Sequence, residues 1–191
     1  MNYRKIAVQF LSGAPAVFAA AVLSMSFFQA CDKQDPRPVH EPEVITTVQV
    51  TLVPDGGGDA VSLLFYDPDG EQGSIEPTIS VSGALMASTT YAVVMELLNE
   101  TESPAGNISE EVAGEANDHL FCFDVVGNIL IRYEDEDENG LPLGLITLWE
   151  TGSAGAAEIT VTLRHQAGTK TGQCPGPGET DVEVTFVLDI V

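Results

Sequence analysis

The sequence predicts an all-β protein, an antiparallel immunoglobulin-like β-sandwich of about 8–9 strands with one short helix. Three observations support this fold class. Runs rich in Val, Ile and Thr recur along the chain, and most alternate apolar with polar residues, as half-buried strands do. Turn signals built from Gly, Pro, Asn and Asp separate these runs at about the spacing of a sandwich. A helix pattern is evident in one segment only.

The clearest strand is the last, where alternate residues form one apolar face that we expect to pack in the core. That face consists of Val182, Val184, Phe186, Leu188 and Ile190. The expected strands are residues 44–53, 61–66, 78–82, 91–98, 119–126, 129–134, 143–151, 157–166 and 180–190.

The helical segment begins at a capping box. Asn107 and Glu110 have the N-x-x-E spacing of that motif, and Glu111 adds a second acid to the first turn, where the helix dipole favours negative charge. We therefore expect a short helix over residues 108–117, crossing one end of the sandwich.

The first residues have the order of a secretion signal. Two bases, Arg4 and Lys5, precede a mostly apolar stretch over residues 6–28, and the small residue Ala30 precedes Cys31. The segment from Phe28 to Cys31 is a loose match to the lipobox of bacterial lipoproteins, in which the cysteine becomes an acylated N-terminus. We expect a signal peptide over 1–30, a lipid-anchored extended tether over 31–43 that is rich in proline, and a single β-sandwich domain over 44–191.

Two alternatives remain open for this segment. One is an ordinary signal peptide followed by a chance cysteine. The other is a retained transmembrane helix, although Gln9, Gly13 and Pro15 interrupt the apolar run. The preferred interpretation places the protein at the outer membrane, anchored by lipid on the periplasmic or the cell-surface side.

The charge balance excludes one class of partner. The chain has 29 acidic residues against 7 Lys and Arg, for a formal net charge of −22. A nucleic-acid binder needs cations to neutralise phosphates, so no nucleic acid is expected as a partner.

Cys122 and Cys174 are the cysteines that remain beyond the lipobox. Secreted proteins meet an environment that favours disulfides, so we expect the two to pair. Two buried free thiols are the alternative.

Several segments of the chain resemble a group of small secreted lipoproteins of Bacteroidota that is commonly labelled "type 1 periplasmic binding fold". These segments are the lipobox-like start, VITTVQVTLVPDGGG, LLNETESPAGNISEEV, DHLFCF, TLRHQ and GETDVEVTF. The label implies two doubly wound α/β lobes, for which this chain has too few residues and too little helix. We therefore expect the family likeness without that fold, and it implies no established activity.

An acidic turn is a candidate calcium site. Asp135, Asp137 and Asn139 place side-chain oxygens at alternate positions, as the start of a calcium loop does. The twelfth position is Ile146, so the closing bidentate Glu of an EF-hand is missing. A solvated hairpin is the alternative, both here and at a shorter acidic cluster around Asp67.

Two histidines are candidate ligands for a transition metal such as zinc or copper. His119 and His165 each share the apolar face of their strand and lie at a strand end. If the two strands are antiparallel neighbours, the imidazoles meet at one end of the sandwich, where Asp118, Glu179 or Asp181 could complete the set. The alternative is that each histidine caps a core strand through backbone hydrogen bonds.

These patterns favour a non-enzymatic, membrane-anchored binding lipoprotein that captures a ligand or metal ion for an outer-membrane transporter. No nucleophile–base pair emerges from the sequence, so we expect no catalytic residues. The alternative function is a structural or adhesive surface module, stabilised by calcium.

Overall fold

The computed structural model describes residues 43–70 and 73–191. The predicted signal peptide, Cys31 and all of the predicted tether except Glu43 lie outside these ranges. The elements are β1 (Thr47–Pro54), β2 (Val61–Tyr66), β3 (Thr78–Val81), β4 (Thr90–Asn99), β5 (Gly106–Asn107), α1 (Ile108–Gly114), β6 (His119–Val126), β7 (Ile129–Tyr133), β8 (Ile146–Thr151), β9 (Gly155–His165) and β10 (Glu179–Ile190).

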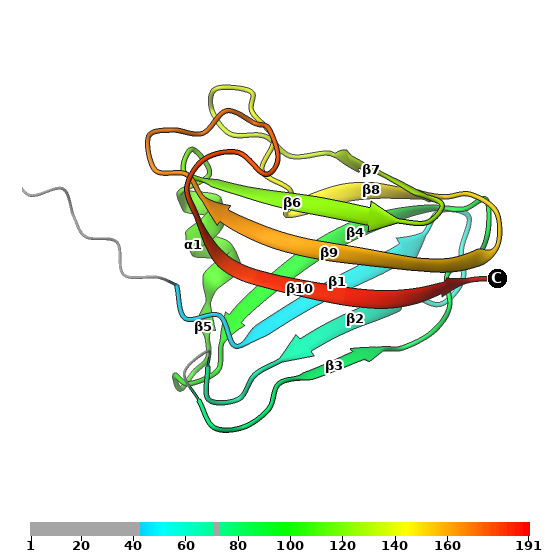
Figure 1. Ribbon diagram of the computed structural model, residues 1–191, viewed down its shortest axis with the longest axis horizontal. Helices are drawn as coiled ribbons and strands as arrows, with labels where there is room; N and C mark the ends of the chain where they lie inside the picture. Colours follow the sequence, from blue (N-terminus) through cyan, green and yellow to red (C-terminus); the bar gives the residue numbers. More distant parts are fainter. Residues whose placement is uncertain (1–42, 71–72) are drawn as a thin grey trace, which may run out of the picture. The chain divides into compact units, whose positions relative to one another are not determined.

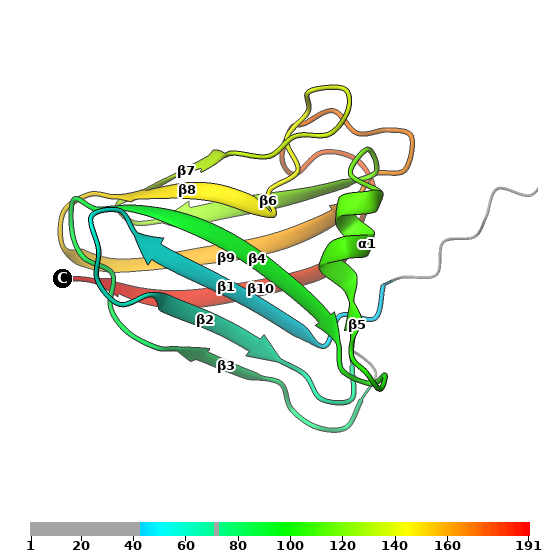
Figure 2. The same cartoon turned by 180° about the vertical axis from the view of Figure 1, so that it is seen from behind.

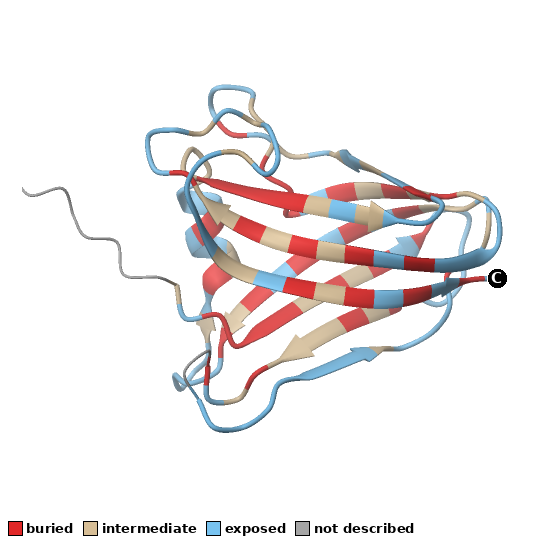
Figure 3. Cartoon of the chain, viewed as in Figure 1, coloured by how far each residue is buried: buried red, intermediate tan, exposed pale blue. Residues whose placement is uncertain are grey.

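The strands form two antiparallel sheets that face each other, which confirms the predicted all-β sandwich (Figures 1 and 2). The larger sheet has the order β3-β2-β1-β4-β8-β7, with the short β5 paired to β4, and the smaller has the order β10-β9-β6. Buried and exposed residues alternate along the central strands (Figure 3). Side chains from both sheets, among them Trp149, Phe121 and Phe186, fill the space between them.

The predicted strands are present, and those at 61–66 and 119–126 have the expected bounds. The strand expected over 143–151 begins three residues later, at Ile146. Leu143 accepts a hydrogen bond from Phe121 N–H of β6, and Leu145 accepts one from Met95 N–H of β4. Residues 143–145 therefore cross from one sheet to the other. Between them Gly144 has φ +100°, a conformation that glycine adopts without strain.

The helix α1 begins where the capping box predicts. The side chain of Asn107 accepts from the backbone N–H of Glu110 and donates to its carboxylate. The helix ends at Gly114, three residues before the predicted end, because the backbone of Glu115 leaves helical geometry (φ −108°, ψ 33°). Ile108 and Val112 are buried, and α1 lies at one end of the sandwich (Figure 2).

The predicted pairing of Cys122 with Cys174 is confirmed. This disulfide joins β6 to the loop between β9 and β10. On the chain-entropy account, closing a loop of this length stabilises the fold by roughly 4 kcal/mol. The bond therefore ties the long β9–β10 connection to the end of the sandwich at which β6 begins.

Candidate metal centre

The two candidate histidines face each other across neighbouring strands. β6 and β9 are antiparallel partners, and in their register His119 lies directly opposite His165. His119 is the first residue of β6 and His165 is the last of β9, so both lie at the α1 end of the sandwich (Figure 1). Their ring centroids are 4.7 Å apart. The adjacency that the sequence argument had to assume is therefore present.

A β-bulge adds a carboxylate to this pair. β9 and β10 pair regularly except between Thr180 and Val182, where the register shifts and leaves Asp181 as the extra residue. Strict alternation from Val182 would place Asp181 on the outer face. The bulge instead turns it inward, and its side chain is only 4% exposed.

The three side chains converge at a spacing that suits a metal ion. One ligand atom each from His119, His165 and Asp181 lie within 4.8 Å of one another. His119 Nε2 and Asp181 Oδ2 are 3.8 Å apart, and neither has a hydrogen-bond partner although both are buried. That gap is too wide for a hydrogen bond. One ion with bonds of about 2.0–2.2 Å to each atom could span it.

The other nitrogen of His119 sets the tautomer. Nδ1 donates to the backbone carbonyl of Glu115, 3.2 Å away at the C-cap of α1. A carbonyl can only accept, so Nδ1 holds the proton and the lone pair lies on Nε2, facing Asp181. Metal-binding histidines are typically oriented by such a hydrogen bond from the second ring nitrogen.

The electrostatics of the cluster favour a neutral imidazole and penalise an ionised carboxylate. Burial lowers the pKa of His119, and neighbouring His165 lowers it further, so the imidazole is neutral at pH 7 and competent as a ligand. Burial raises the pKa of Asp181 to about 6, although His165 and Arg164 oppose the shift. A bound cation would remove the penalty on the Asp181 carboxylate.

Two further acids approach the same imidazole, and the sequence argument missed both. Ligand atoms of Glu43, Glu115 and His119 also lie within 4.8 Å of one another. Burial and the nearby charges of Glu111, Glu115 and Asp181 raise the pKa of Glu43 to about 7. Glu43 belongs to a segment that the sequence assigns to a tether, so no strand pattern could have found it. Glu115 was not predicted because the helix was expected to continue to residue 117, whereas it ends at Gly114.

Two other acids near the histidines take no part in the convergent group. Glu179 lies opposite His165 in the β9–β10 register but is exposed. Asp118 directs Oδ1 at the backbone N–H of Gly168, at 2.9 Å. Asp181 is therefore the carboxylate that the structure brings to both imidazoles.

The candidate calcium residues are engaged by the protein itself. Asp135 accepts from the backbone N–H groups of Gly144 and Ile146. Asp137 accepts from two backbone N–H groups of its own turn, and its second oxygen lies 3.0 Å from Lys170 Nζ. The Asn139 amide donates to Asn117. These contacts make the turn a hydrogen-bonded loop closed by an ion pair, and calcium binding there stays a prediction.

Within residues 43–70 and 73–191, no helix is both long and apolar enough to span a membrane. Comparison with known proteins finds no matching family model, no matching curated protein and no matching solved structure.

Proposed function

We propose that this domain binds a divalent transition metal ion, zinc in the first instance, through His119 Nε2, His165 and Asp181. The observation that supports this most directly is the pair of unpartnered buried atoms, His119 Nε2 and Asp181 Oδ2, at 3.8 Å. Burying a polar atom without a partner costs about 1–3 kcal/mol. An ion between them satisfies both atoms. Imidazole and carboxylate ligands suit zinc, and imidazole also suits copper.

Capture is the role that this ligand set favours. Three protein ligands leave the fourth position of a tetrahedral ion open to water or to an incoming ligand. The cluster lies at the end of the sandwich, where three strand ends meet rather than mid-sheet (Figure 1). Together with the lipobox-like sequence around Cys31, this supports a lipid-anchored, non-enzymatic protein that holds a metal ion for an outer-membrane transporter.

A structural role for the ion is the second candidate. Glu43 has a carboxylate oxygen within 4.8 Å of a ring nitrogen of His119, and a movement of this side chain toward the ion would make it a fourth protein ligand. A site closed by four protein ligands holds its metal permanently and stabilises the fold. In that case the ion would fix the start of the domain onto the sandwich.

Calorimetric titration of zinc, and then copper, into chelator-treated protein tests the proposal. We expect one ion per chain, with binding lost in His119→Ala and His165→Ala and kept in His40→Ala, which removes the third histidine of the chain. Circular dichroism checks that each variant is folded. Parent-like binding by both site variants, or no binding by the parent, would falsify the proposal. Fast exchange of bound zinc with a chelator favours capture, and exchange that is slow until the protein unfolds favours the structural role.

A further inference from the structure

The disulfide joins the parts of the chain that carry the three proposed metal ligands. Cys122 lies on β6, and Cys174 lies in the β9–β10 loop, residues 166–178, at the α1 end of the sandwich (Figure 1). β6 and the two strands that flank this loop each carry one ligand: His119 at the start of β6, His165 at the end of β9 and Asp181 near the start of β10. A short stretch of chain therefore separates the disulfide from each ligand.

The first part of the loop is held by contacts that do not involve the disulfide. The backbone N–H of Gln166 donates to the carbonyl of Asp118, and that of Gly168 donates to the Asp118 carboxylate. The ammonium group of Lys170 forms a buried ion pair with the connection between β7 and β8. These contacts hold residues 166–170 whether or not the disulfide is present.

The second part of the loop has no such support. Among the residues that the structure describes, no backbone–backbone hydrogen bond joins residues 171–177 to another part of the chain. Cys174 is exposed, and its sulfur is bonded to Cys122, which is only 7% exposed. The disulfide therefore takes the place of the backbone hydrogen bonds that would otherwise hold this segment on the sandwich.

Gln166 shows that the closed position of this segment is costly. Its side chain is fully buried, and neither atom of its amide has a hydrogen-bond partner within the chain. Gly176 packs directly on it, because a Cβ added at Gly176 would lie 2.3 Å from Gln166 Nε2. A buried amide without a partner destabilises the state that buries it. Water would satisfy the amide if the segment lifted, so loss of the disulfide favours the open loop.

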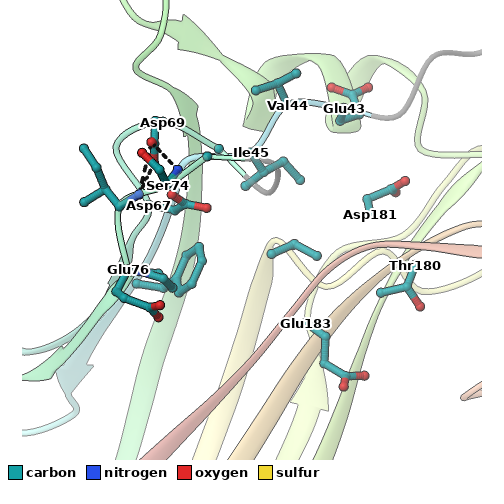
Figure 4. Close-up of a pocket in the computed structure, with 16 residues that line it drawn as sticks. Glu43, Val44, Ile45, Asp67, Asp69, Ser74, Glu76, Thr180, Asp181 and Glu183 are labelled. Atoms are coloured by element: carbon teal, nitrogen blue, oxygen red, sulfur yellow. Dashed lines mark hydrogen bonds between the residues drawn. The ribbon is translucent and has the colours of Figure 1, made fainter.

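The end of the loop leads into the metal site. Arg164 of β9 donates to the carbonyl of Gly178 and to the hydroxyl of Thr180. Figure 4, which looks into the pocket beside the start of β10, shows Thr180 and Asp181 next to each other there. The inward orientation of Asp181 depends on the bulge at this point. Movement of residues 178–180 would therefore also displace the carboxylate ligand.

We propose that the disulfide is a redox switch on the metal site, which keeps the ligands together when oxidised and lowers metal affinity when reduced. This inference rests on the proposed metal binding and adds its regulation. The reductant is a dithiol, whose thiolate attacks the exposed sulfur of Cys174 and displaces Cys122 as a thiolate. The second thiol of the reductant resolves the mixed disulfide. Two electrons pass to the cysteine pair, two protons complete its thiols, and the reductant becomes a disulfide.

The coupling between metal and disulfide must be reciprocal. If reduction weakens zinc binding tenfold, bound zinc must make the midpoint potential of the disulfide more negative by about 30 mV, since the couple transfers two electrons. The switch therefore has two independent measurements, the zinc affinity of each redox state and the midpoint potential with and without zinc.

Calorimetric titration of zinc into the oxidised parent and into the double variant Cys122→Ala, Cys174→Ser tests the switch. This variant opens the loop without leaving thiols that could bind zinc themselves, and we expect its zinc affinity to be at least tenfold lower. Leu52→Ala is the matched control, because it destabilises the fold by truncating a fully buried side chain on β1 of the other sheet. It should bind zinc like the parent.

The outcomes separate the switch from the metal site. Parent-like affinity in the double variant, or an equal loss in Leu52→Ala, would overturn the switch and leave the metal site standing. A parent that binds no zinc would overturn both proposals. Circular dichroism of the double variant and of the reduced parent shows whether each is folded. If both lose the strand signal, the disulfide holds the whole fold together and the switch is wrong. If only the double variant does, a midpoint potential of the parent that zinc leaves unchanged overturns the switch.

Discussion

Asp137 and Asp181 are both buried carboxylates, yet the chain provides for them in opposite ways. Asp137 accepts two backbone hydrogen bonds at 2.8 and 3.0 Å and pairs with Lys170. Although burial opposes the shift, these partners lower its pKa below the usual value. Asp181 has an oxygen without a donor, and burial raises its pKa to about 6.

This difference in partners distinguishes a carboxylate that stabilises the fold from a carboxylate that can bind an external ligand. A carboxylate whose partners all come from the chain stabilises the fold and has nothing left to bind. A carboxylate that is buried without partners destabilises the chain by itself, so its placement is explained more readily by a partner from outside.

The largest change in stability is expected at Asp137, the carboxylate whose partners all come from the chain. Lys170→Met should lower the free energy of unfolding by about 3–5 kcal/mol, because Asp137 would remain buried without its counter-charge. Urea denaturation measures the change. Arg132→Met is the matched control, since Arg132 pairs with Glu150 at the surface, where its side chain is 54% exposed, and the loss there should be below about 1 kcal/mol. Similar losses in the two variants would contradict our account of Asp137.

The two carboxylates should also respond to pH with opposite signs. The unfolded chain loses the Asp181 proton near pH 4 and the folded chain near pH 6, so the metal-free protein should lose up to about 3 kcal/mol as pH rises between these values. Glu43 extends the decline toward pH 7. The low pKa of Asp137 acts the other way, because its contribution is present above the unfolded pKa and is lost as pH falls through the folded one. The lowered pKa of His119 acts in the same direction as that of Asp137, because below about pH 6.5 the unfolded chain takes up a proton that the buried imidazole does not.

Urea midpoints measured from pH 4 to pH 8 in chelator show the balance of these terms. Saturating zinc should flatten the decline, because the ion holds the carboxylates ionised. If Asp181→Asn shows the same pH dependence as the parent between pH 4 and pH 6, the assignment of Asp181 is refuted.

Much of the fold could be predicted because period-2 patterning reports which side of a strand is buried. His119 and His165 were placed correctly on the core side for that reason, and the N-cap at Asn107 follows from local spacing. The sequence of β6 or of β9 alone does not show that these two strands pair. The pairing depends on the connecting loops and on the disulfide, which joins residues far apart in the chain.

The site acids were harder to predict because each depends on a break in regular structure. Asp181 faces inward through a bulge, and period-2 counting cannot anticipate an extra residue. Glu115 follows an early helix end. Asp137 resembled a calcium ligand because the local sequence places its carboxylate in an acidic turn. The sequence does not show that Lys170, 33 residues later, forms an ion pair with that carboxylate.

Asp181→Asn should separate stability from binding. Removing a desolvated charge should stabilise the metal-free protein at pH 7 by about 1–3 kcal/mol, while zinc affinity falls because a ligand is lost. Asp137→Asn is the matched comparison and should destabilise the protein, because the Lys170 ammonium then loses its counter-charge. Urea denaturation with and without zinc checks both. If Asp181→Asn destabilises the metal-free protein as Asp137→Asn does, the chain stabilises both carboxylates and our distinction between them is wrong.

The smallest change in zinc affinity is expected at Glu43, a half-buried acid beside the three proposed ligands. If His119, His165 and Asp181 hold the ion, Glu43→Gln should weaken zinc binding by less than about tenfold, because three ligands remain and only a nearby charge is lost. Glu158→Gln, an exposed change on β9, controls for net charge and should leave affinity unchanged. A loss as large as that of Asp181→Asn would instead make Glu43 a fourth ligand, and the site would then be closed and structural rather than open for capture.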